Sequence, residues 1–272
     1  MDLRELRAGL SGHGWTIGVW LRYTVRPDVA PPSSEWSVVA EDPKIGEVRL
    51  TGRLRHEESK TLVMLVHGLG GDVDAPYMIA SARATSRADL SCLRLNLRGA
   101  DRKGEDFYHA GLTADLHAAM SSEELARYDE IFVLGYSLGG HVTLRYATDA
   151  PDPRVAAVAA VSPPLDLDLS ARSFDRSSCD IYRRNVLAGL KEIYQNVARR
   201  RPVPTPMAEV RRIRKIREWD DRVVAPRYGF RDAEHYYKSV SVSSRFGEIP
   251  VRSMVIFAKN DPMVPALSLI HI

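Results

Sequence analysis

The chain has 272 residues, 44% of them apolar, and its 38 basic and 35 acidic residues give a formal charge of +3. This length can bury one large core, so we expect a single domain that carries an insertion. Most nucleic-acid-binding domains have a strong excess of basic residues, so this balanced charge does not indicate a nucleic-acid partner. The sequence has neither an apolar run of about 18 residues, which a membrane span needs, nor an N-terminal signal-peptide pattern. We therefore expect a soluble, cytoplasmic protein.

The two cysteines, Cys92 and Cys179, are far apart, and Cys92 lies in an apolar, strand-like run. A disulfide framework or a zinc site is not expected from this pattern, and a reducing compartment fits it.

Short apolar runs bounded by turn residues alternate with helical patterns along the chain. We predict strands at 61–67, 90–97, 130–135, 155–161 and 251–258, and helices at 76–88, 111–126 and 138–148. Residues 14–54 alternate polar and apolar side chains around a Pro-rich break, which predicts a few antiparallel strands before the others. The pattern indicates an α/β fold, with a mostly parallel sheet covered by helices on both faces.

The alternation stops between residues 165 and 245, where helix signals accumulate and no strand can be recognised. Thr205 is predicted to cap a helix that has Pro206 at its first position. Apolar residues then recur every third position, at Met207, Val210, Ile213 and Ile216. We predict a helical cap inserted into the α/β core.

This insertion is also the most basic part of the chain. Its cations are Arg199, Arg200, Arg201, Arg211, Arg212, Arg214, Lys215 and Arg217. A solvated helix face is the favoured interpretation, and contact with anionic head groups or an acidic partner is the alternative.

A serine stands between a predicted strand and a predicted helix, in the sequence Gly135-Tyr136-Ser137-Leu138-Gly139. In such a Gly-x-Ser-x-Gly corner the serine has a strained backbone, and only glycine avoids collision at the flanking positions. The helix that follows directs free N–H groups at the reacting centre. We therefore predict that Ser137 is a nucleophile, Gly135 and Gly139 form its elbow, and the Leu138 N–H binds an oxyanion. A purely structural turn is the alternative.

Two further segments follow predicted strands. His67-Gly68-Leu69-Gly70-Gly71 comes after the first of them, where a Gly-rich turn supplies a second oxyanion N–H, which we assign to Leu69. His67 and Gly68 are predicted to support this loop.

Asp261 follows the last predicted strand, at the sheet edge where functional groups gather in open α/β folds. It is the predicted acid of the site. Asp166 and Asp168, after the preceding strand, are the competing candidates.

Several segments together resemble the YheT-like branch of the α/β-hydrolase superfamily, also called hydrolase family 4. They are residues 61–71, NLRGADRKG at 96–104, YHAGLTADL at 108–116, GYSLGG at 135–140, IREWDDRVVAPRYGFRDAEHYYKSVS at 216–241 and AKNDPMVP at 258–265. The resemblance implies a serine hydrolase that acts on carboxylic esters, with relatives that handle acyl chains and lipids. It also implies a triad in the order Ser, Asp, His.

The family's histidine follows the aspartate by a few dozen residues, and the printed chain ends eleven positions after Asp261. His271 is too close to Asp261 for an intervening strand and helix. The remaining candidates do not occupy the family position either; they are His67, His109, His117, His141 and His235. We therefore expect the histidine beyond residue 272 and the 272-residue chain to be nearly inactive.

The last six residues, LSLIHI, match the family poorly and correspond to one reading frame of a sequencing-library adapter. We expect them to be non-native. The expected organisation has four parts: core at 1–164, cap at 165–245, core at 246–266 and the foreign tail at 267–272.

The expected reaction is ester hydrolysis through an acyl-enzyme on Ser137, with neither a metal nor an organic cofactor. A non-catalytic protein that binds an acyl ligand, and an acyltransferase that uses the same serine, are the alternatives. The cap is predicted to roof an acyl pocket over Ser137, with the arginines pointing outward.

Overall fold

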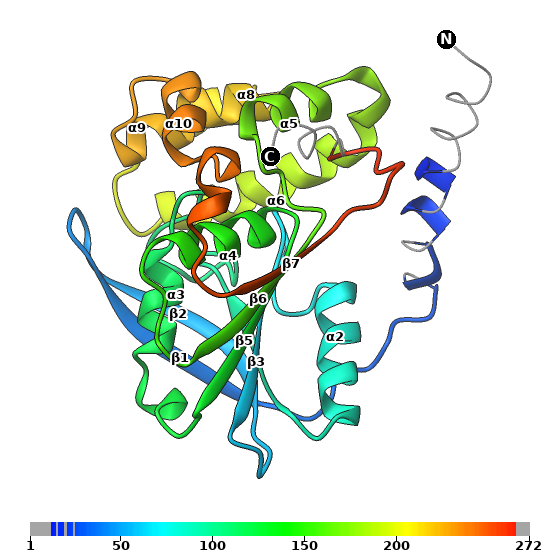
Figure 1. Cartoon of the computed structure of the whole chain (residues 1–272). Helices are drawn as coiled ribbons and strands as arrows, with labels where there is room; N and C mark the ends of the chain where they lie inside the picture. The colour runs from blue at the N-terminus through cyan, green and yellow to red at the C-terminus, as the bar shows by residue number, and fades with distance from the viewer. Residues whose placement is uncertain (1–11, 15, 19–20, 24, 265–272) are drawn as a thin grey trace.

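The computed structural model describes residues 12–14, 16–18, 21–23 and 25–264, and a seven-stranded sheet runs through it (Figure 1). The strands are β1 (Ser34–Asp42), β2 (Gly46–Arg55), β3 (Thr61–Val66), β4 (Ser91–Asn96), β5 (Glu130–Tyr136), β6 (Val155–Val161) and β7 (Arg252–Ile256). Their order is β1-β2-β4-β3-β5-β6-β7. β2 pairs antiparallel with β1 and β4, and the remaining pairs are parallel. The mostly parallel sheet predicted from the sequence is confirmed.

The segment before the parallel strands was predicted only in part. β1 and β2 form the expected antiparallel pair. Strands before residue 34 were a wrong expectation, since 12–14, 16–18 and 21–23 are helical. The apolar residues there recur at helical as well as alternating spacing, and a short segment does not separate the two periods.

Helices cover both faces of the sheet. α2 (Pro76–Arg87) packs on one face, where Met78 and Ala82 meet Leu65 and Cys92. α3 (Ala114–Met120) and α4 (Leu138–Thr148) cover the other face, with η1 (Glu123–Leu125) after α3. Side chains alternate across a strand, so neighbouring residues of β3 serve different cores. Cys92 and Cys179 are both buried, and neither forms a disulfide bond.

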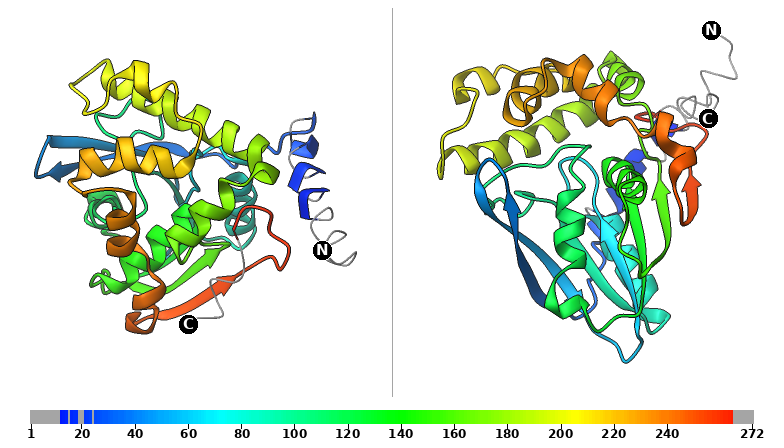
Figure 2. Two further views of the ribbon diagram at one scale, coloured as in Figure 1. Left: turned by 90° about the horizontal axis from the view of Figure 1, so that it is seen from above. Right: turned by 60° about the vertical axis from the view of Figure 1, so that its left-hand side comes forward.

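Residues 162–251, all of them described, contain no strand, and their helices gather at one end of the sheet (Figures 1 and 2). They are α5 (Leu167–Phe174), η2 (Ser177–Cys179), α6 (Asp180–Ala198), α7 (Met207–Val210), α8 (Ile216–Trp219), η3 (Asp220–Val224), α9 (Ala225–Tyr228), α10 (Ala233–Val240) and η4 (Ser243–Glu248). This segment, which we call the cap, leaves the sheet after β6 and returns to it at β7.

The predicted cap helix after Thr205 is shorter than its pattern indicated. Its N-cap is Pro206, and it ends at Val210. Thr205 instead donates its hydroxyl hydrogen to the Arg222 carbonyl oxygen. Val210, Ile213 and Ile216 are all buried, but turns separate them, so the three-residue spacing reflects burial and not one helix.

The expectation that the cap arginines point outward holds for Arg199, Arg200, Arg211, Arg212 and Arg214, which are exposed together with Lys215. It is wrong for two others. Arg201 donates to the Ile45 carbonyl oxygen, and Arg217 is half-buried and pairs with Asp168. Sequence alone does not reveal these partners, because they lie 156 and 49 positions away.

Among the described residues, no helix has the length and apolar character needed to cross a bilayer.

Candidate active site

Ser137 occupies the sharp corner between β5 and α4. Its backbone has φ 50° and ψ −119°, a conformation that costs a non-glycine residue energy. A Cβ on Gly135 would lie 2.3 Å from the Gly139 carbonyl oxygen, and a Cβ on Gly139 would lie 2.3 Å from the His67 carbonyl oxygen. The corner can therefore close only with glycine at both positions.

The loop after β3 lies directly against this corner. A Cβ on Gly68 would lie 3.3 Å from the Cβ of Ser137. The structure thus brings Ser137, Gly68, Gly139 and His67 together from segments that are about 70 positions apart in the chain.

Three N–H groups of this loop have partners. The Gly68 N–H donates to the Tyr77 hydroxyl at 3.0 Å, and the Gly70 N–H donates to the Tyr108 hydroxyl at 2.6 Å. The Gly71 N–H donates to the Gly68 carbonyl oxygen at 3.1 Å. Within the described part of the chain, the Leu69 N–H has no such partner. It is therefore the loop amide available to a developing negative charge.

The Leu138 N–H is the second available donor. Leu138 is the first residue of α4, and the four N–H groups that begin a helix have no partner within it. The Ser137 N–H donates to the Val161 carbonyl oxygen at 2.8 Å, whereas no acceptor for Leu138 occurs among the described residues. The helix dipole adds positive potential at this end.

Sequence reasoning did not identify Tyr77 and Tyr108, the two hydroxyls that hold the loop. Tyr77 comes from α2, and its ring lies 4.7 Å from the ring of Tyr136, the residue before the serine. Burial raises the pKa of Tyr77 to about 12, so its hydroxyl stays neutral and can accept the Gly68 hydrogen bond at ordinary pH. No local pattern in the sequence indicates that these tyrosine hydroxyls accept hydrogen bonds from the loop after β3.

His67 is fully occupied by the loop. Its Nδ1 lies 2.8 Å from the Gly68 carbonyl oxygen, and its Nε2 accepts the Leu97 N–H at 3.1 Å. Burial lowers its pKa to about 4, so the ring is neutral, with the proton on Nδ1. Neither nitrogen is free to take a proton from Ser137.

Other histidines are also buried or remote. The Nδ1 of His141 lies 3.1 Å from the Ala110 carbonyl oxygen, and burial lowers its pKa to about 4. His109 accepts the Gly111 N–H, and burial lowers its pKa to about 3. His117 packs edge-on against the ring of Tyr146, and His235 is on α10 of the cap. His271 and the predicted foreign tail at 267–272 lie outside the described residues.

Asp261 follows β7, two strand spacings or roughly 10 Å across the sheet from β5. Its Oδ1 accepts the N–H groups of Met263 and Val264 at 2.9 and 3.1 Å. No hydrogen bond joins it to a histidine within the described ranges. The structure therefore places this carboxylate at the expected edge of the sheet without bringing it into contact with Ser137.

The two competing acids have structural partners. Asp166 caps α5 by accepting the Leu169 N–H at 2.9 Å. Asp168 pairs with Arg217 and with Arg172. Among the described residues, the Asp261 carboxylate accepts hydrogen bonds only from its own turn, at Met263 and Val264.

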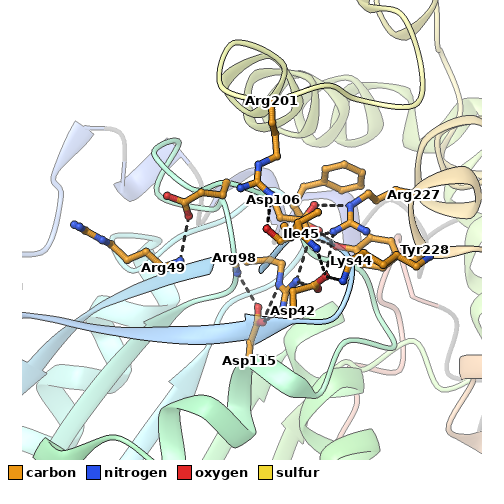
Figure 3. A network of polar contacts seen from close by, with 12 residues as sticks. Asp42, Lys44, Ile45, Arg49, Arg98, Asp106, Asp115, Arg201, Arg227 and Tyr228 are labelled. Carbon is orange, nitrogen blue, oxygen red and sulfur yellow. Dashed lines mark hydrogen bonds and ion pairs between the residues drawn. The ribbon is translucent and has the colours of Figure 1, made fainter. Parts of the chain in front are cut away.

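A buried ion-pair network joins the cap to the core (Figure 3). Arg98 binds the carboxylates of Asp42, Asp106 and Asp115 at 2.7 to 3.1 Å. Arg227 of α9 reaches Asp106 with two hydrogen bonds, of 2.9 and 2.7 Å. Each of these three carboxylates is thus paired with at least one of the two guanidinium groups. In the described residues no group of three or more His, Cys, Asp or Glu side chains is placed to hold a metal ion.

A family model described as "alpha/beta hydrolase fold" matches residues 61–194. The chain is 28% identical over 219 residues to "Putative esterase YheT" of Escherichia coli. This match covers 76% of this chain and 63% of that protein. It is 24% identical to "Monoacylglycerol lipase" and 27% identical to "Medium-chain fatty acid ethyl ester synthase/esterase 2", both of Saccharomyces cerevisiae. Those matches cover 78% and 75% of this chain. The chain spans only 50% and 51% of the two yeast proteins.

Solved structures show the same fold. The esterase Pf2001 of Pyrococcus furiosus superposes with a TM-score of 0.56 at 17% identity, covering 89% of this chain and 81% of that one. The α/β hydrolase GrgF of Penicillium superposes with a TM-score of 0.57 at 19% identity, covering 88% and 84%. The chain therefore has the α/β-hydrolase fold, and it is similar to the YheT-like branch of that superfamily.

Proposed function

We propose that the protein hydrolyses carboxylic esters through an acyl-enzyme on Ser137. The observation that carries the proposal is the strained serine corner beside the N–H groups of Leu69 and Leu138, neither of which has a hydrogen-bond partner in the part of the chain that the structure describes. The names of the relatives, an esterase, a monoacylglycerol lipase and an ester synthase/esterase, support the same class of reaction.

In the proposed reaction, a histidine removes the proton of the Ser137 hydroxyl as the oxygen attacks the ester carbonyl. The Leu69 and Leu138 N–H groups bind the oxyanion, and the protonated histidine gives its proton to the leaving alcohol. Water then attacks the acyl-enzyme and releases the acid. Asp261 is the proposed partner of that histidine. No cofactor is needed for these steps.

The base is proposed to come from outside the described residues. His67 has no free nitrogen, and burial keeps His109 and His141 neutral, each with its Nδ1 in a hydrogen bond. The Nε2 of His141 is buried without a partner among the described residues, on a ring that is completely buried in the core. The proposal does not use His271, which is too close in sequence to Asp261.

The test measures p-nitrophenyl ester hydrolysis by the protein expressed from its complete gene and by the 272-residue chain. In the complete protein, Ser137→Ala should lower turnover by about 10⁴- to 10⁶-fold, because the nucleophile is lost while the oxyanion donors remain. The 272-residue chain should be as slow as its own Ser137→Ala variant. Turnover that persists in Ser137→Ala of the complete protein would refute the nucleophile. Ser137-dependent turnover by the short chain would mean that a residue within it is the base.

Acyl transfer to an alcohol is the second candidate, favoured by the relative named as an ethyl ester synthase/esterase. It uses the same serine and the same oxyanion donors, with an alcohol replacing water in the second step. Product analysis in added ethanol separates the two: ethyl ester beyond the share expected from uncatalysed ethanolysis indicates transfer, and acid alone indicates hydrolysis.

A further inference from the structure

Apolar side chains are exposed along the segment that precedes the sheet. Ile17, Leu21 and Val25 are 44%, 53% and 77% exposed, and Val29 is 82% exposed. Residues 16–18, 21–23 and 25 are helical, and the Arg26 N–H donates to the Arg22 carbonyl oxygen at 2.8 Å, so Leu21 and Val25, four positions apart in this turn, lie on one face. We call these four exposed side chains the apolar stripe. Apolar side chains that gather on a water-soluble surface mark an interaction site.

Cationic side chains flank this stripe. Arg22 and Arg26 line a surface cavity of about 760 Å³ together with Arg83 of α2. Arg83 pairs with Asp28 at 2.6 Å, whereas Arg22 and Arg26 form no ion pair with any described residue. The cavity wall therefore carries uncompensated positive charge next to the apolar stripe.

The same segment touches the loop that carries Asp261. A Cβ on Gly12 would lie 2.1 Å from the Asn260 carbonyl oxygen. His13 stacks on Tyr182 at the start of α6, with its Nδ1 3.1 Å from the tyrosine hydroxyl. Figures 1 and 2 show the blue N-terminal helical turns beside the red chain that follows β7.

We propose that this N-terminal patch, formed by Ile17, Leu21, Val25, Val29, Arg22 and Arg26, docks on an anionic phospholipid surface. The apolar side chains would enter the boundary of the acyl chains, and the two guanidinium groups would bind lipid phosphates. Nucleic acid would leave the apolar stripe unexplained. A second copy of the chain would bring like charges together.

The proposal goes beyond ester hydrolysis and does not require it. If Ser137 acts on lipid-like esters, docking would bring the Asp261 edge of the sheet close to the substrate surface. Binding to vesicles is measurable in a protein without catalytic activity, so the two proposals can fail separately.

The test is sedimentation of the 272-residue chain with vesicles. One set is phosphatidylcholine alone, and the other is equal parts phosphatidylcholine and phosphatidylglycerol. Binding should be clearly stronger to the anionic set and should fall as salt is added, because exposed charges are screened. Arg22→Gln with Arg26→Gln should weaken that binding about thirtyfold, since each cation near an anionic surface contributes about one kcal/mol. Leu21→Ser with Val25→Ser should weaken it about tenfold or more.

Matched controls change the same residue types elsewhere. Arg211→Gln with Arg212→Gln removes two exposed cap arginines, and Val39→Ser removes an exposed valine from β1. Both should bind vesicles like the parent chain, and all variants should unfold at the parent temperature, because the altered side chains are exposed. Equal loss in patch and control variants would overturn the proposal, as would absence of binding to anionic vesicles. Self-association that disappears in Leu21→Ser with Val25→Ser, without vesicle binding, would assign the patch to a second copy.

Discussion

At the scale of single residues, the candidate site depends on the few backbone N–H groups near Ser137 that have no acceptor among the described residues. In the stretch Gly68 to Gly71 after β3, three amides donate to the loop itself or to tyrosine hydroxyls, and among these four described residues the Leu69 N–H is the one left unused. Preorganised donors of this kind contribute to catalysis because they need not reorient as charge develops. The hydroxyls of Tyr77 and Tyr108 hold the residues on either side of Leu69, and we expect them to position its N–H.

Tyr77→Phe tests this positioning in the complete protein. The variant leaves the buried Gly68 N–H without its acceptor, which costs about 1 to 3 kcal/mol and lets the loop shift. We expect kcat to fall about tenfold or more with little change in KM, because the oxyanion contact forms mainly in the transition state. Tyr182→Phe, which removes a hydroxyl at the periphery, is the control. Equal effects on kcat in both variants would contradict a role in positioning.

Gly139→Ala tests the closure of the serine corner. Its Cβ would lie 2.3 Å from the His67 carbonyl oxygen, and 2.5 Å from that of Val66, both of them backbone atoms that cannot rotate away. We expect a loss of about 2 to 4 kcal/mol in the free energy of unfolding, measured in urea. Gly247→Ala is the matched control, since a Cβ there meets nothing within 4 Å. Similar stability for the two variants would show that the corner can relax.

At the scale of elements, the cap is held to the core by buried polar contacts. Arg227 of α9 binds Asp106, whose side chain is almost completely buried, and the Tyr236 hydroxyl of α10 accepts the Ala110 N–H at 2.9 Å. Residues 106–110 precede α3 in the core. The cap is thus anchored next to the histidine-containing turn at 108–111 and not only through its apolar face.

Arg227→Ala should remove the ion pair between α9 and Asp106 and leave the Tyr236 contact in place. A buried carboxylate that loses a cation destabilises the folded state, here by about 3 kcal/mol. Arg222→Ala, which breaks a half-exposed pair with Glu218, should cost less than about 1 kcal/mol. Urea unfolding measures both values, and limited proteolysis should cut the cap earlier in Arg227→Ala alone. Equal costs would mean that the network does not hold the cap.

Asp220 makes the cap sensitive to pH. Burial raises its pKa from the usual 3.8 to about 7, and it accepts the Tyr237 hydroxyl hydrogen at 2.7 Å. The folded state therefore holds a proton that the unfolded state releases near pH 4. The stabilisation is complete below pH about 4 and is lost as the pH rises through about 7.

Asp220→Asn should remove this dependence, because the amide accepts the same hydrogen bond without titrating. Relative to the parent, the variant should gain stability between pH 5 and pH 8 in urea unfolding. Asp129→Asn changes an exposed aspartate and should keep the parent's pH profile. An unchanged pH profile in Asp220→Asn would show that Asp220 is ionised throughout this range.

At the scale of the whole molecule, local patterns in the sequence were enough to predict the sheet and most of its helices. β3 to β7 are apolar runs with clear turn boundaries, and α4 begins and ends where its pattern indicated. The helical start of the chain was missed and α7 was predicted too long, because short segments follow the burial imposed by distant contacts more than their own periodicity.

The sequence predicted those residues of the candidate site that lie within or next to a recognisable motif. Ser137, its glycines and Leu69 follow recognisable strands. Tyr77, Tyr108 and the Arg98 network depend on contacts between distant segments, which no local spacing encodes.

The central claim is that Ser137 forms a covalent acyl intermediate, and peptide mapping after fluorophosphonate treatment of the complete protein tests it most directly. The proposal predicts one adduct, on the peptide containing Ser137, that forms in step with loss of esterase activity and is absent in Ser137→Ala. An adduct on a different residue, or full loss of activity with Ser137 unmodified, would contradict it.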